Sequence, residues 1–266
     1  MGRDRVATRP RSLHGVKTFA LHRGSMHDPV PYDDAYVRNL FDRMGTTYDL
    51  VNHVSSFGFC RWWRSTCVDL AEVRHGDLVC DLMAGGGECW GLILRRARSV
   101  VSIDFSEVMI GRQRRHKTRF GGRVEVRCEN AMASSVPDAG VDVVVCAYGL
   151  KTLSPESLAL LAREVARILK PGGRFSFIEV SSAAGWWAGP LYRFYLAEVI
   201  PVVGKLCLGD IECYRMLGRY TEAFGSCAGV VPHFEAAGLE PEMRSHFFGC
   251  ATSIAGRKAG PGPRRE

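Results

Sequence analysis

Apolar and polar positions follow two patterns along this chain. Short apolar runs bounded by turn residues have the length and composition of buried strands, and segments with apolar residues at helical spacing lie between them. The predicted strands are residues 78–82, 99–104, 124–128, 141–147 and 174–180, and the predicted helices are residues 89–96, 106–120 and 155–169. This alternation predicts an α/β fold with a doubly wound, mostly parallel sheet whose two faces are both covered by helices.

The C-terminal part of the chain adds two strands to this pattern. Residues 231–237 have helical spacing and end at Gly238, and strands are predicted over 239–244 and 246–255. The predicted sheet is therefore seven-stranded. The helix before the fifth strand is marked at both ends, because Ser154 and Pro155 are typical of a helix start and Pro171-Gly172-Gly173 is typical of its end.

Two segments do not follow the alternation of strands and helices. Residues 32–73 contain helical patterns over 35–49 and 62–73, and residues 182–226 are rich in aromatic side chains. We assign both segments to a helical cap on the substrate side of one domain, which spans residues 32–258. Residues 259–266 are expected to be a disordered tail.

Residues 1–31 have no sustained periodicity, and we predict a flexible or arm-like segment there. A disordered tail, a lid over the site and an arm that reaches a neighbouring subunit all remain open. The oligomeric state, a homo-oligomer included, is likewise open.

The net charge of +7 is concentrated at the two ends of the chain. Residues 1–31 carry six basic against two acidic side chains, and residues 257–266 carry four against one. The residues between them hold 25 of each kind, so the folded part is neutral. Basic ends of this kind are usually solvated, and we therefore expect no nucleic-acid partner.

The ten cysteines do not indicate a disulfide scaffold or a metal site. No Cys-x-x-Cys pair occurs, and Cys80 and Cys146 stand in apolar runs, as small buried side chains of a reducing compartment do. The N-terminus has no continuous apolar run of the kind found in signal peptides. Charged residues interrupt the apolar patches near Trp186 and Val199, so no integral membrane segment is predicted. We expect a soluble, cytoplasmic protein.

Two neighbouring strand ends carry the pattern of a nucleoside-binding crevice. In LVCDLMAGGGECW, residues 78–90, an apolar run ends at Asp81 and a glycine-rich turn follows, and in VVSIDFS, residues 100–106, a second run ends at Asp104. Glycines let the backbone approach a ligand, and an acid about 20 residues further on accepts ribose hydroxyls. The alternatives are a helix cap at Ser106 for Asp104 and a plain connection for the glycine turn.

Several longer segments carry a resemblance to a known family. They are LFDRMGTTYDLVNHVSSFGFCRWWR (residues 40–64), ILKPGGRFSFIEVS (residues 168–181), LYRFYLAEVIPVVGKL and the later CYRML. With the glycine turn, they resemble the class I S-adenosylmethionine-dependent methyltransferases. More narrowly, the chain is similar to the ubiquinone/menaquinone biosynthesis C-methyltransferase family over roughly residues 36–258.

The resemblance implies an S-adenosyl-L-methionine site at the carboxyl ends of the strands. It assigns the methionine end and ribose to the glycine turn, the ribose hydroxyls to Asp104, and the adenine to the residues after the second and third strands. Ala147 would line the methionine chain, and Tyr48 and Arg64 would close the site. The implied cofactor-binding residues are Tyr48, Arg64, Asp81, Ala84, Gly85, Gly87, Asp104, Phe105, Asn130, Ala131, Met132 and Ala147. A turn role for Asn130 and core packing for Tyr48 remain alternatives.

The departures from the family concern the acceptor more than the cofactor. Met83 stands where the family usually has a small residue, and Gly86 where it often has Thr. After the fourth strand the family carries Phe-Gly-Leu-Arg-Asn, whereas this chain reads Tyr148-Gly149-Leu150-Lys151-Thr152. In the family that Arg-Asn pair lies near the quinol head group, and an ammonium does not replace a guanidinium conservatively. The acceptor site is therefore predicted to be rebuilt.

Candidates for acceptor chemistry follow from the residues left in these segments. His53, Lys151 and Tyr148 are the predicted catalytic residues, because C-methylation of a phenol or enol needs help with proton transfer. Trp186, Trp187, Tyr192, Tyr195 and His233 are the predicted substrate-binding residues. The Trp and Tyr faces could stabilise a cation, and His233 is, with His53, a candidate base. A structural role for the histidines and core packing for the aromatic residues are the alternatives. No metal is expected.

Our leading hypothesis is an S-adenosylmethionine-dependent C-methyltransferase of a lipophilic, prenylated or aromatic small molecule in specialised-metabolite biosynthesis. The second is a demethylmenaquinone or polyprenyl-benzoquinol methyltransferase, and the third an O- or N-methyltransferase of a small metabolite. A cofactor-binding partner protein without catalysis stays open as another class. A nucleic-acid methyltransferase is disfavoured, because no Asn/Asp-Pro-Pro-Tyr motif follows the fourth strand.

Overall fold

A computed structural model describes residues 32–44, 56, 58–206 and 211–260. The predicted N-terminal segment, residues 261–266 of the predicted tail, Tyr48 and His53 lie outside the described residues.

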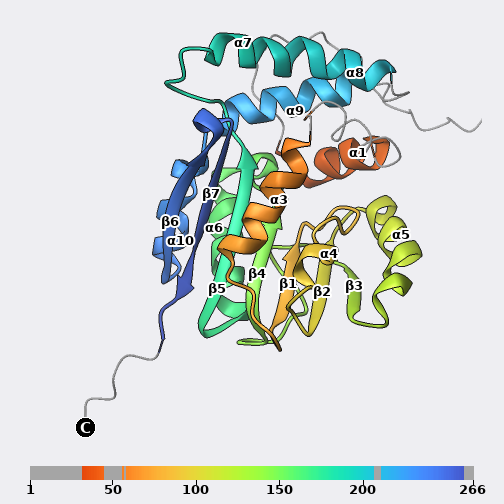
Figure 1. The fold of residues 1–266 in the computed structure, drawn as a ribbon, viewed down its shortest axis with the longest axis vertical. Coiled ribbons are helices and arrows are strands. Elements are labelled where there is room, and N and C mark those ends of the chain that lie inside the picture. Colours follow the sequence, from red (N-terminus) through yellow and green to blue (C-terminus); the bar gives the residue numbers. More distant parts are fainter. Residues whose placement is uncertain (1–31, 45–55, 57, 207–210, 261–266) are drawn as a thin grey trace, which may run out of the picture.

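The predicted seven-stranded, mostly parallel sheet is confirmed (Figure 1). Its strand order is β3-β2-β1-β4-β5-β7-β6, and only β7 runs antiparallel to its neighbours. The strands are β1 (Leu78–Leu82), β2 (Ser99–Asp104), β3 (Val124–Cys128), β4 (Val141–Ala147), β5 (Leu169–Val180), β6 (Leu239–His246) and β7 (Ala251–Lys258). The first four match the predicted runs residue for residue. This order reverses beside β1, which places a topological switch point between β1 and β4.

The last three strands differ from the predicted ranges for local reasons. β5 begins at Leu169 rather than Arg174, because the Pro171-Gly172-Gly173 stretch continues the strand, with Gly172 at φ 72°. The last strand was predicted to begin at His246, which is wrong, because β6 extends to His246 and β7 begins at Ala251. A 3-10 turn at Phe247–Gly249 separates β6 from β7 there.

Two helical layers cover the sheet. On one face lie α6 (Pro155–Ile168) and α10 (Val231–Ala236), and on the other lie α3 (Phe59–Leu70), α4 (Trp90–Ile93) and α5 (Glu107–His116). Ser154 and Ser106 cap α6 and α5, because their hydroxyls accept the backbone N–H of Ser157 and Met109. α4 is one turn long, shorter than the predicted 89–96, since turn hydrogen bonds replace the helix after Ile93.

A helical cap lies over the carboxyl ends of β1, β4 and β5 (Figure 1). It consists of α1 (Asp34–Met44), α7 (Gly189–Phe194), a π-helical stretch at Tyr195–Val199, α8 (Ile200–Leu206) and α9 (Ile211–Phe224). Its core is formed by Leu40 and Met44 of α1 with Tyr214 and Tyr220 of α9. The C-terminal part of α3, which we grouped with the cap, packs on the sheet through Cys67 and Val68. No helix of the described part is long and apolar enough to cross a membrane.

Candidate methyl-transfer site

A cavity opens at the carboxyl ends of β1, β2 and β4, directly under α1. With its open mouth it encloses about 870 Å³. Ten of the residues predicted for the site line it: Arg64, Ala84, Gly85, Asp104, Phe105, Asn130, Ala131, Met132, Ala147 and Tyr148. Ligands of open α/β sheets bind at this edge, beside the switch point, so the cavity has the position expected for a nucleotide-like ligand.

The glycine turn after β1 shapes the floor of this first cavity. Gly85 has φ 56°, and its N–H donates to Oδ2 of Asp104 at 2.8 Å. Gly87 has φ 89° and does not line the cavity; a Cβ there would lie 2.5 Å from the ring of Trp90, so its role is to let Trp90 pack. Met83 adopts a left-handed φ of 52°, and its sulfur lies 2.7 Å from where a Cβ on Gly149 would be.

Asp104 is held from two sides by the backbone. Its Oδ2 accepts from Gly85, and its Oδ1 accepts from the N–H of Ser106 at 2.9 Å. The side chain of Asp104 is buried. Burial raises the pKa of Asp104 to about 6, against the lowering effect of these N–H groups. Near neutral pH the carboxylate therefore remains largely ionised and able to accept hydrogen bonds from a diol.

Asp81 and Glu88 place two more carboxyl groups at the first cavity. Asp81 is buried behind the cavity wall, whereas Glu88 is half-buried and lines the cavity. Oδ2 of Asp81 and Oε1 of Glu88 are buried atoms without a hydrogen-bond partner among the described residues. Burial and the charge of Asp104 raise the pKa of Asp81 to about 8, whereas Arg64 opposes this. Burial likewise raises the pKa of Glu88, again against Arg64. Unpartnered buried acids favour a ligand that brings positive charge or N–H donors.

Glu88 reaches back over the glycine turn. A Cβ on Gly86 would lie 2.5 Å from its Oε1, and a Cβ on Gly85 would lie 3.2 Å from its Oε2. The missing side chain at position 86 therefore makes room for the carboxylate of Glu88, which lines the first cavity. Gly86 was recognisable in the sequence as a departure from the family, whereas the role of Glu88 depends on this contact.

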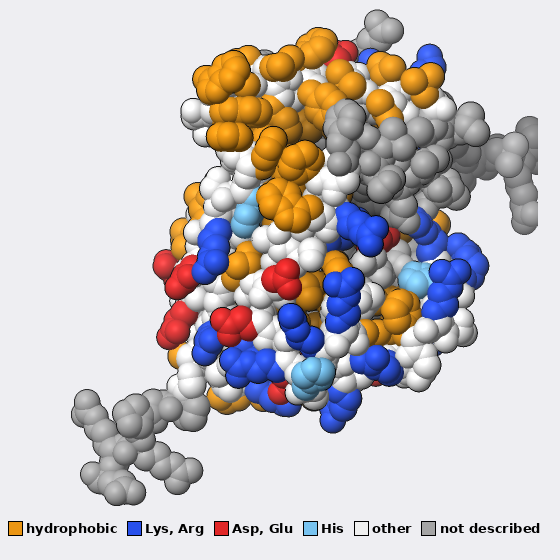
Figure 2. Space-filling model, in the orientation of Figure 1, with side chains coloured by type: hydrophobic (Ala, Val, Ile, Leu, Met, Phe, Trp, Pro, Cys, Tyr) orange, Lys and Arg blue, Asp and Glu red, His pale blue; other side chains and the backbone are white. Residues whose placement is uncertain are grey.

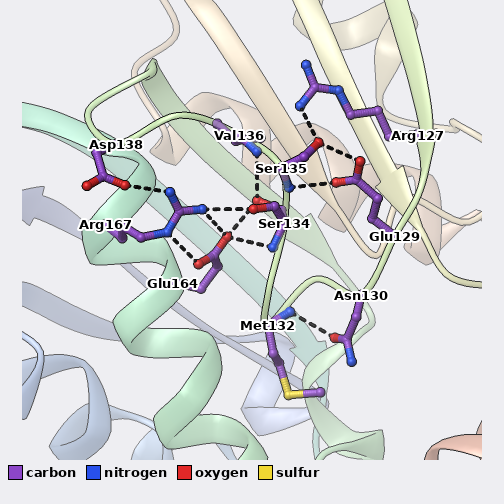
Figure 3. A network of polar contacts seen from close by, with 10 residues as sticks. All are labelled: Arg127, Glu129, Asn130, Met132, Ser134, Ser135, Val136, Asp138, Glu164 and Arg167. Atoms are coloured by element: carbon purple, nitrogen blue, oxygen red, sulfur yellow. Dashed lines mark hydrogen bonds and ion pairs between the residues drawn. The ribbon is translucent and has the colours of Figure 1, made fainter.

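The loop after β3 forms the far wall of the cavity and is fastened to α6 (Figure 3). Glu164 of α6 accepts from the N–H and the hydroxyl of Ser134, at 2.8 and 2.6 Å. Arg167 bridges Glu164, Asp138 and the carbonyl of Ser134. Oδ1 of Asn130 accepts from the N–H of Met132 at 2.9 Å, which leaves its amide nitrogen pointing away from this bond (Figure 3). The loop therefore presents Asn130 and the backbone beyond it from a rigid support.

A second, larger cavity lies between the sheet and the cap and encloses about 1580 Å³ with its mouth. Its walls are mostly aliphatic and aromatic side chains of α7, the π-helical stretch and α9. Lys151 is the charged side chain in the wall, and it is 5% exposed. Its Nζ donates to Oε1 of Glu179 at 2.7 Å, and its backbone N–H donates to Oε2. Glu179 is fully buried.

Trp63 supplies the other strong donor of this second cavity. It lines the cavity, is 5% exposed, and its Nε1 has no hydrogen-bond partner among the described residues. A buried N–H without a partner is uncommon in folded proteins and favours an acceptor atom on a ligand. Trp63 and Lys151 thus provide polar recognition in an otherwise apolar space.

Tyr148 separates the two cavities and lines both. It directly follows β4 and has a left-handed φ of 73°. This backbone conformation is unfavourable for any residue other than glycine. Its hydroxyl donates to the carbonyl of Cys60 at 2.8 Å, and its ring lies 5.3 Å from Cζ of Arg64. A ligand in the first cavity and one in the second would meet at this ring.

Three of the five predicted substrate-binding residues line the second cavity, and two lie away from both cavities. Trp186, Tyr192 and Tyr195 line the second cavity. Trp187 is 89% exposed and lines neither cavity, because it lies on the outer side of the turn before α7. His233 of α10 also lies apart from both cavities, since α10 packs against α6 and β6 on the far side of the sheet. Asp81 backs the first cavity without lining it.

The cavity residues that were not singled out from the sequence include Trp63, Glu88 and Phe247, and Glu179 pairs with Lys151 in the wall of the second cavity. Of these, Glu88 and Glu179 carry a recognisable signal, because each is an acid inside an apolar run or beside a glycine turn. No cluster of metal-ligating side chains occurs within the described ranges.

Most of the chain is similar in sequence to known proteins. The model of the ubiE/COQ5 methyltransferase family matches residues 30–258. A ubiquinone/menaquinone biosynthesis C-methyltransferase UbiE of Rubrivivax gelatinosus is 32% identical, over 84% of this chain and 87% of the relative. A demethylmenaquinone methyltransferase of Thermus thermophilus is also 32% identical, over 82% of this chain and 99% of the relative.

Among solved structures, geranyl diphosphate C-methyltransferase of Streptomyces coelicolor, in complex with S-adenosyl-L-homocysteine, aligns with a TM-score of 0.52. The identity is 14%, over 75% of this chain and 79% of that chain. At this identity the similarity concerns the fold, which is the one predicted from the alternation of strands and helices.

Proposed function

The chain belongs to the ubiE/COQ5 methyltransferase family, and from that premise we propose that it methylates a ring carbon of a lipophilic quinol. It is an S-adenosylmethionine-dependent methyltransferase. What we propose beyond this activity is the identity of the acceptor, a quinol. It agrees with the demethylmenaquinone named for the Thermus relative and with the quinone biosynthesis named for the Rubrivivax relative, and it takes precedence over our first hypothesis of a specialised metabolite.

The residues of the first cavity fit S-adenosylmethionine. Asp104 would accept the ribose hydroxyls, Asn130 and Phe105 would hold the adenine, and Arg64 would pair with the carboxylate of the amino-acid end. The unpartnered oxygens of Asp81 and Glu88 suit its ammonium group. When bound, this cofactor supplies an electrophilic methyl group on a positively charged sulfur. Tyr48, outside the described residues, is still proposed to close the site.

The observation that carries the proposal is the meeting of two unlike cavities at Tyr148. The first combines carboxyl groups, a guanidinium and an amide with apolar side chains, and the second is lined by aromatic and aliphatic side chains with two buried donors. Methyl transfer needs the acceptor carbon aligned with the methyl group and shielded from water. Cavities that adjoin at Tyr148 would place the cofactor and the acceptor next to each other.

The second cavity fits an oxygenated ring with an apolar tail. Its size and aliphatic lining suit a prenyl chain, whereas Nζ of Lys151 and Nε1 of Trp63 can each donate to a ring oxygen. A ring carbon of a quinol becomes nucleophilic when its hydroxyl loses a proton. The ammonium of Lys151 would stabilise the resulting phenolate, and Glu179 would hold that ammonium in place. The acceptor of the hydroxyl proton is not assigned to a described residue, and His53 stays a prediction.

Two residue differences from the family favour a second class of acceptor. Lys151 stands where the family has Arg, and Met83 where it has a small residue, and Met83 lines the first cavity beside Tyr148. A compact ammonium contacts one oxygen where a guanidinium spans two. A prenylated aromatic acceptor with a single ring oxygen is therefore the second candidate.

Calorimetry with S-adenosylmethionine and S-adenosylhomocysteine, followed by product analysis, tests the proposal. The purified protein would then be incubated with demethylmenaquinol, a polyprenyl-benzoquinol and a prenylated indole, and the products fragmented by mass spectrometry. A methyl group retained on the quinol ring carbon supports the proposal, and the Asp104→Ala variant is the control for cofactor-dependent turnover. Methylation of the indole alone would favour the second candidate. Cofactor binding with no product from any acceptor would favour the partner protein without catalysis.

A further inference from the structure

The exposed apolar side chains gather at one end of the molecule. Ten large hydrophobic residues are exposed among those described, and eight of them lie on α7, α8 and their lead-in, on the β6–β7 turn or at the start of α3. These eight, which we call the apolar end, are Trp62, Trp187, Leu191, Phe194, Val202, Leu206, Phe247 and Phe248. Figure 2 shows hydrophobic side chains massed over the cap, whereas charged side chains dominate the opposite half of this face.

Ring contacts make the apolar end continuous across three elements. Phe247 lies 4.6 Å from Phe59 of α3, and Trp186 stacks on Phe248 at 5.3 Å with an angle of 7° between the rings. Trp186 in turn contacts Trp187 at 6.4 Å. Segments that are far apart in the sequence therefore build one aromatic surface.

The turn that presents Phe247 and Phe248 is strained. Both residues have a left-handed φ, of 43° and 56°. Two consecutive aromatic residues in this region are unfavourable, and such conformations persist where the surrounding structure holds them. In this turn Phe247 is 43% exposed and Phe248 is 65% exposed.

The helical stretch from α7 to α8 is apolar on both sides. Its inner side contributes Leu196, Pro201 and Gly204, which are buried against the rest of the cap. Its outer side exposes Leu191 by 70% and Leu206 by 79%. A helix with apolar side chains all round is normally covered on all sides.

The second cavity opens within the apolar end. Leu191, Phe194 and Phe247 are exposed and also line the second cavity. A second protein copy seated on this surface would close that mouth. A lipid surface would instead bring a lipophilic acceptor directly to it.

The exposed charged side chains of these elements decide which lipid surface fits. Arg61 precedes Trp62, Arg193 lies between Leu191 and Phe194, and Lys205 precedes Leu206. Glu198 is the exposed acid of the same helical stretch. Tryptophan and basic residues around an apolar face are typical of helices that lie in a bilayer interface and contact anionic head groups.

We propose that the apolar end docks on an anionic lipid bilayer, with the second cavity facing the membrane. The docking surface follows from the residues of the described cap, turn and α3. The direct entry of the acceptor from the bilayer rests, in addition, on the proposed function.

Vesicle flotation tests this docking with the full chain, without cofactor or acceptor. The wild-type protein should float with vesicles of equal parts phosphatidylcholine and phosphatidylglycerol, and less with pure phosphatidylcholine. The Val202→Ser/Leu206→Ser variant changes exposed residues that do not line the cavity, and it should bind the mixed vesicles at least roughly tenfold more weakly. The matched control Leu160→Ser/Met243→Ser changes the two exposed apolar residues elsewhere and should float like wild type.

The outcomes separate this proposal from the others. Wild-type protein that stays in the dense fraction, or variant and control that float alike, would overturn the docking surface. Light scattering that shows a wild-type dimer, a monomeric Val202→Ser/Leu206→Ser variant and no flotation would assign the surface to a second copy. Unchanged S-adenosylhomocysteine affinity of the variant verifies its folding. Flotation without any methyl transfer would contradict the proposed function alone.

Discussion

Nζ of Lys151 lies 2.7 Å from Oε1 of Glu179 in the wall of the second cavity, and both side chains are buried. The two residues come from the segment after β4 and from the end of β5, so the ion pair also ties two strand ends together. Oε1 of Glu179 accepts the N–H of Val180 as well. A buried pair with such additional bonds fixes the position of a charge where an acceptor would lie.

Breaking this pair should destabilise the protein. Glu179→Gln leaves the Lys151 ammonium buried without its counter-charge, and we expect a loss of about 3–5 kcal/mol in the free energy of unfolding. Urea denaturation followed by circular dichroism measures it. Lys151→Met/Glu179→Gln should lose less than Glu179→Gln alone, because no unpaired charge remains. Asp69→Asn, in an exposed pair with Arg96, is the control and should stay within about 0.5 kcal/mol of wild type. A double variant that loses as much as Glu179→Gln would contradict a cost from the unpaired ammonium.

The parallel sheet was predictable because β1, β2 and β4 are short, mostly apolar runs and β3 alternates Val with charged residues, with turn residues and helical patterns between them. Asp104 was predictable for the same reason, since its place is set by the end of one strand. Phe247 and Trp63 were not, because their positions depend on a strained turn and on the packing of α3 against β5. Those contacts join residues distant in sequence, and local periodicity carries no information about them.

Trp63 should matter for the acceptor and not for the cofactor. Trp63→Phe removes the Nε1 donor and keeps most of the ring, so acceptor binding should weaken by roughly 1–3 kcal/mol. KM for the quinol would then rise about five- to a hundredfold, with S-adenosylhomocysteine affinity near wild type. Trp62→Phe on the exposed side of α3 is the matched control. An unchanged KM in Trp63→Phe would show that this N–H does not contact the acceptor.

Gly86 and Glu88 should behave as a coupled pair. The Cβ of Gly86→Thr would lie 2.5 Å from Oε1 of Glu88, so the carboxylate must move and S-adenosylhomocysteine affinity should fall. Glu88→Asp shortens the side chain by one methylene and should restore part of that affinity in the double variant. Calorimetry with 5′-methylthioadenosine, which lacks the amino-acid end, should show little change in any variant. Additive losses, or equal losses for both ligands, would contradict a contact between Glu88 and the amino-acid end.

Cofactor affinity should increase with pH because of Asp81. Its pKa is raised from 3.8 to about 8 by burial and by Asp104, so the free protein holds a proton there that a cationic ligand must displace. S-adenosylmethionine and S-adenosylhomocysteine both carry the ammonium group that Asp81 is proposed to hold. The affinity of each should therefore rise between about pH 6 and 8, at most roughly tenfold per pH unit, and calorimetry across this range measures it.

The free energy of unfolding of the free protein should decrease as the pH rises, whereas the cofactor affinity increases. A raised pKa means that the contribution of Asp81 is complete below pH 3.8 and is lost as the pH rises through about 8. Thermal unfolding of the free protein should thus show less stability at pH 8.5 than at pH 6, and Asp81→Asn should reduce this slope. A variant with the wild-type slope would assign the effect to another group.

Asp104 gives the most direct test of where the cofactor lies. Its carboxylate is positioned by Gly85 and Ser106, so it can accept two ribose hydroxyls without reorganising. Hydrogen bonds to a charged group contribute roughly 1.5–3 kcal/mol each, and Asp104→Ala should weaken S-adenosylhomocysteine binding by more than about tenfold. Glu125→Ala, an exposed acid on the neighbouring strand β3, is the control. Calorimetry that finds equal affinity in wild type and Asp104→Ala would place the cofactor away from the end of β2, and with it the meeting of the two cavities at Tyr148 would lose its role.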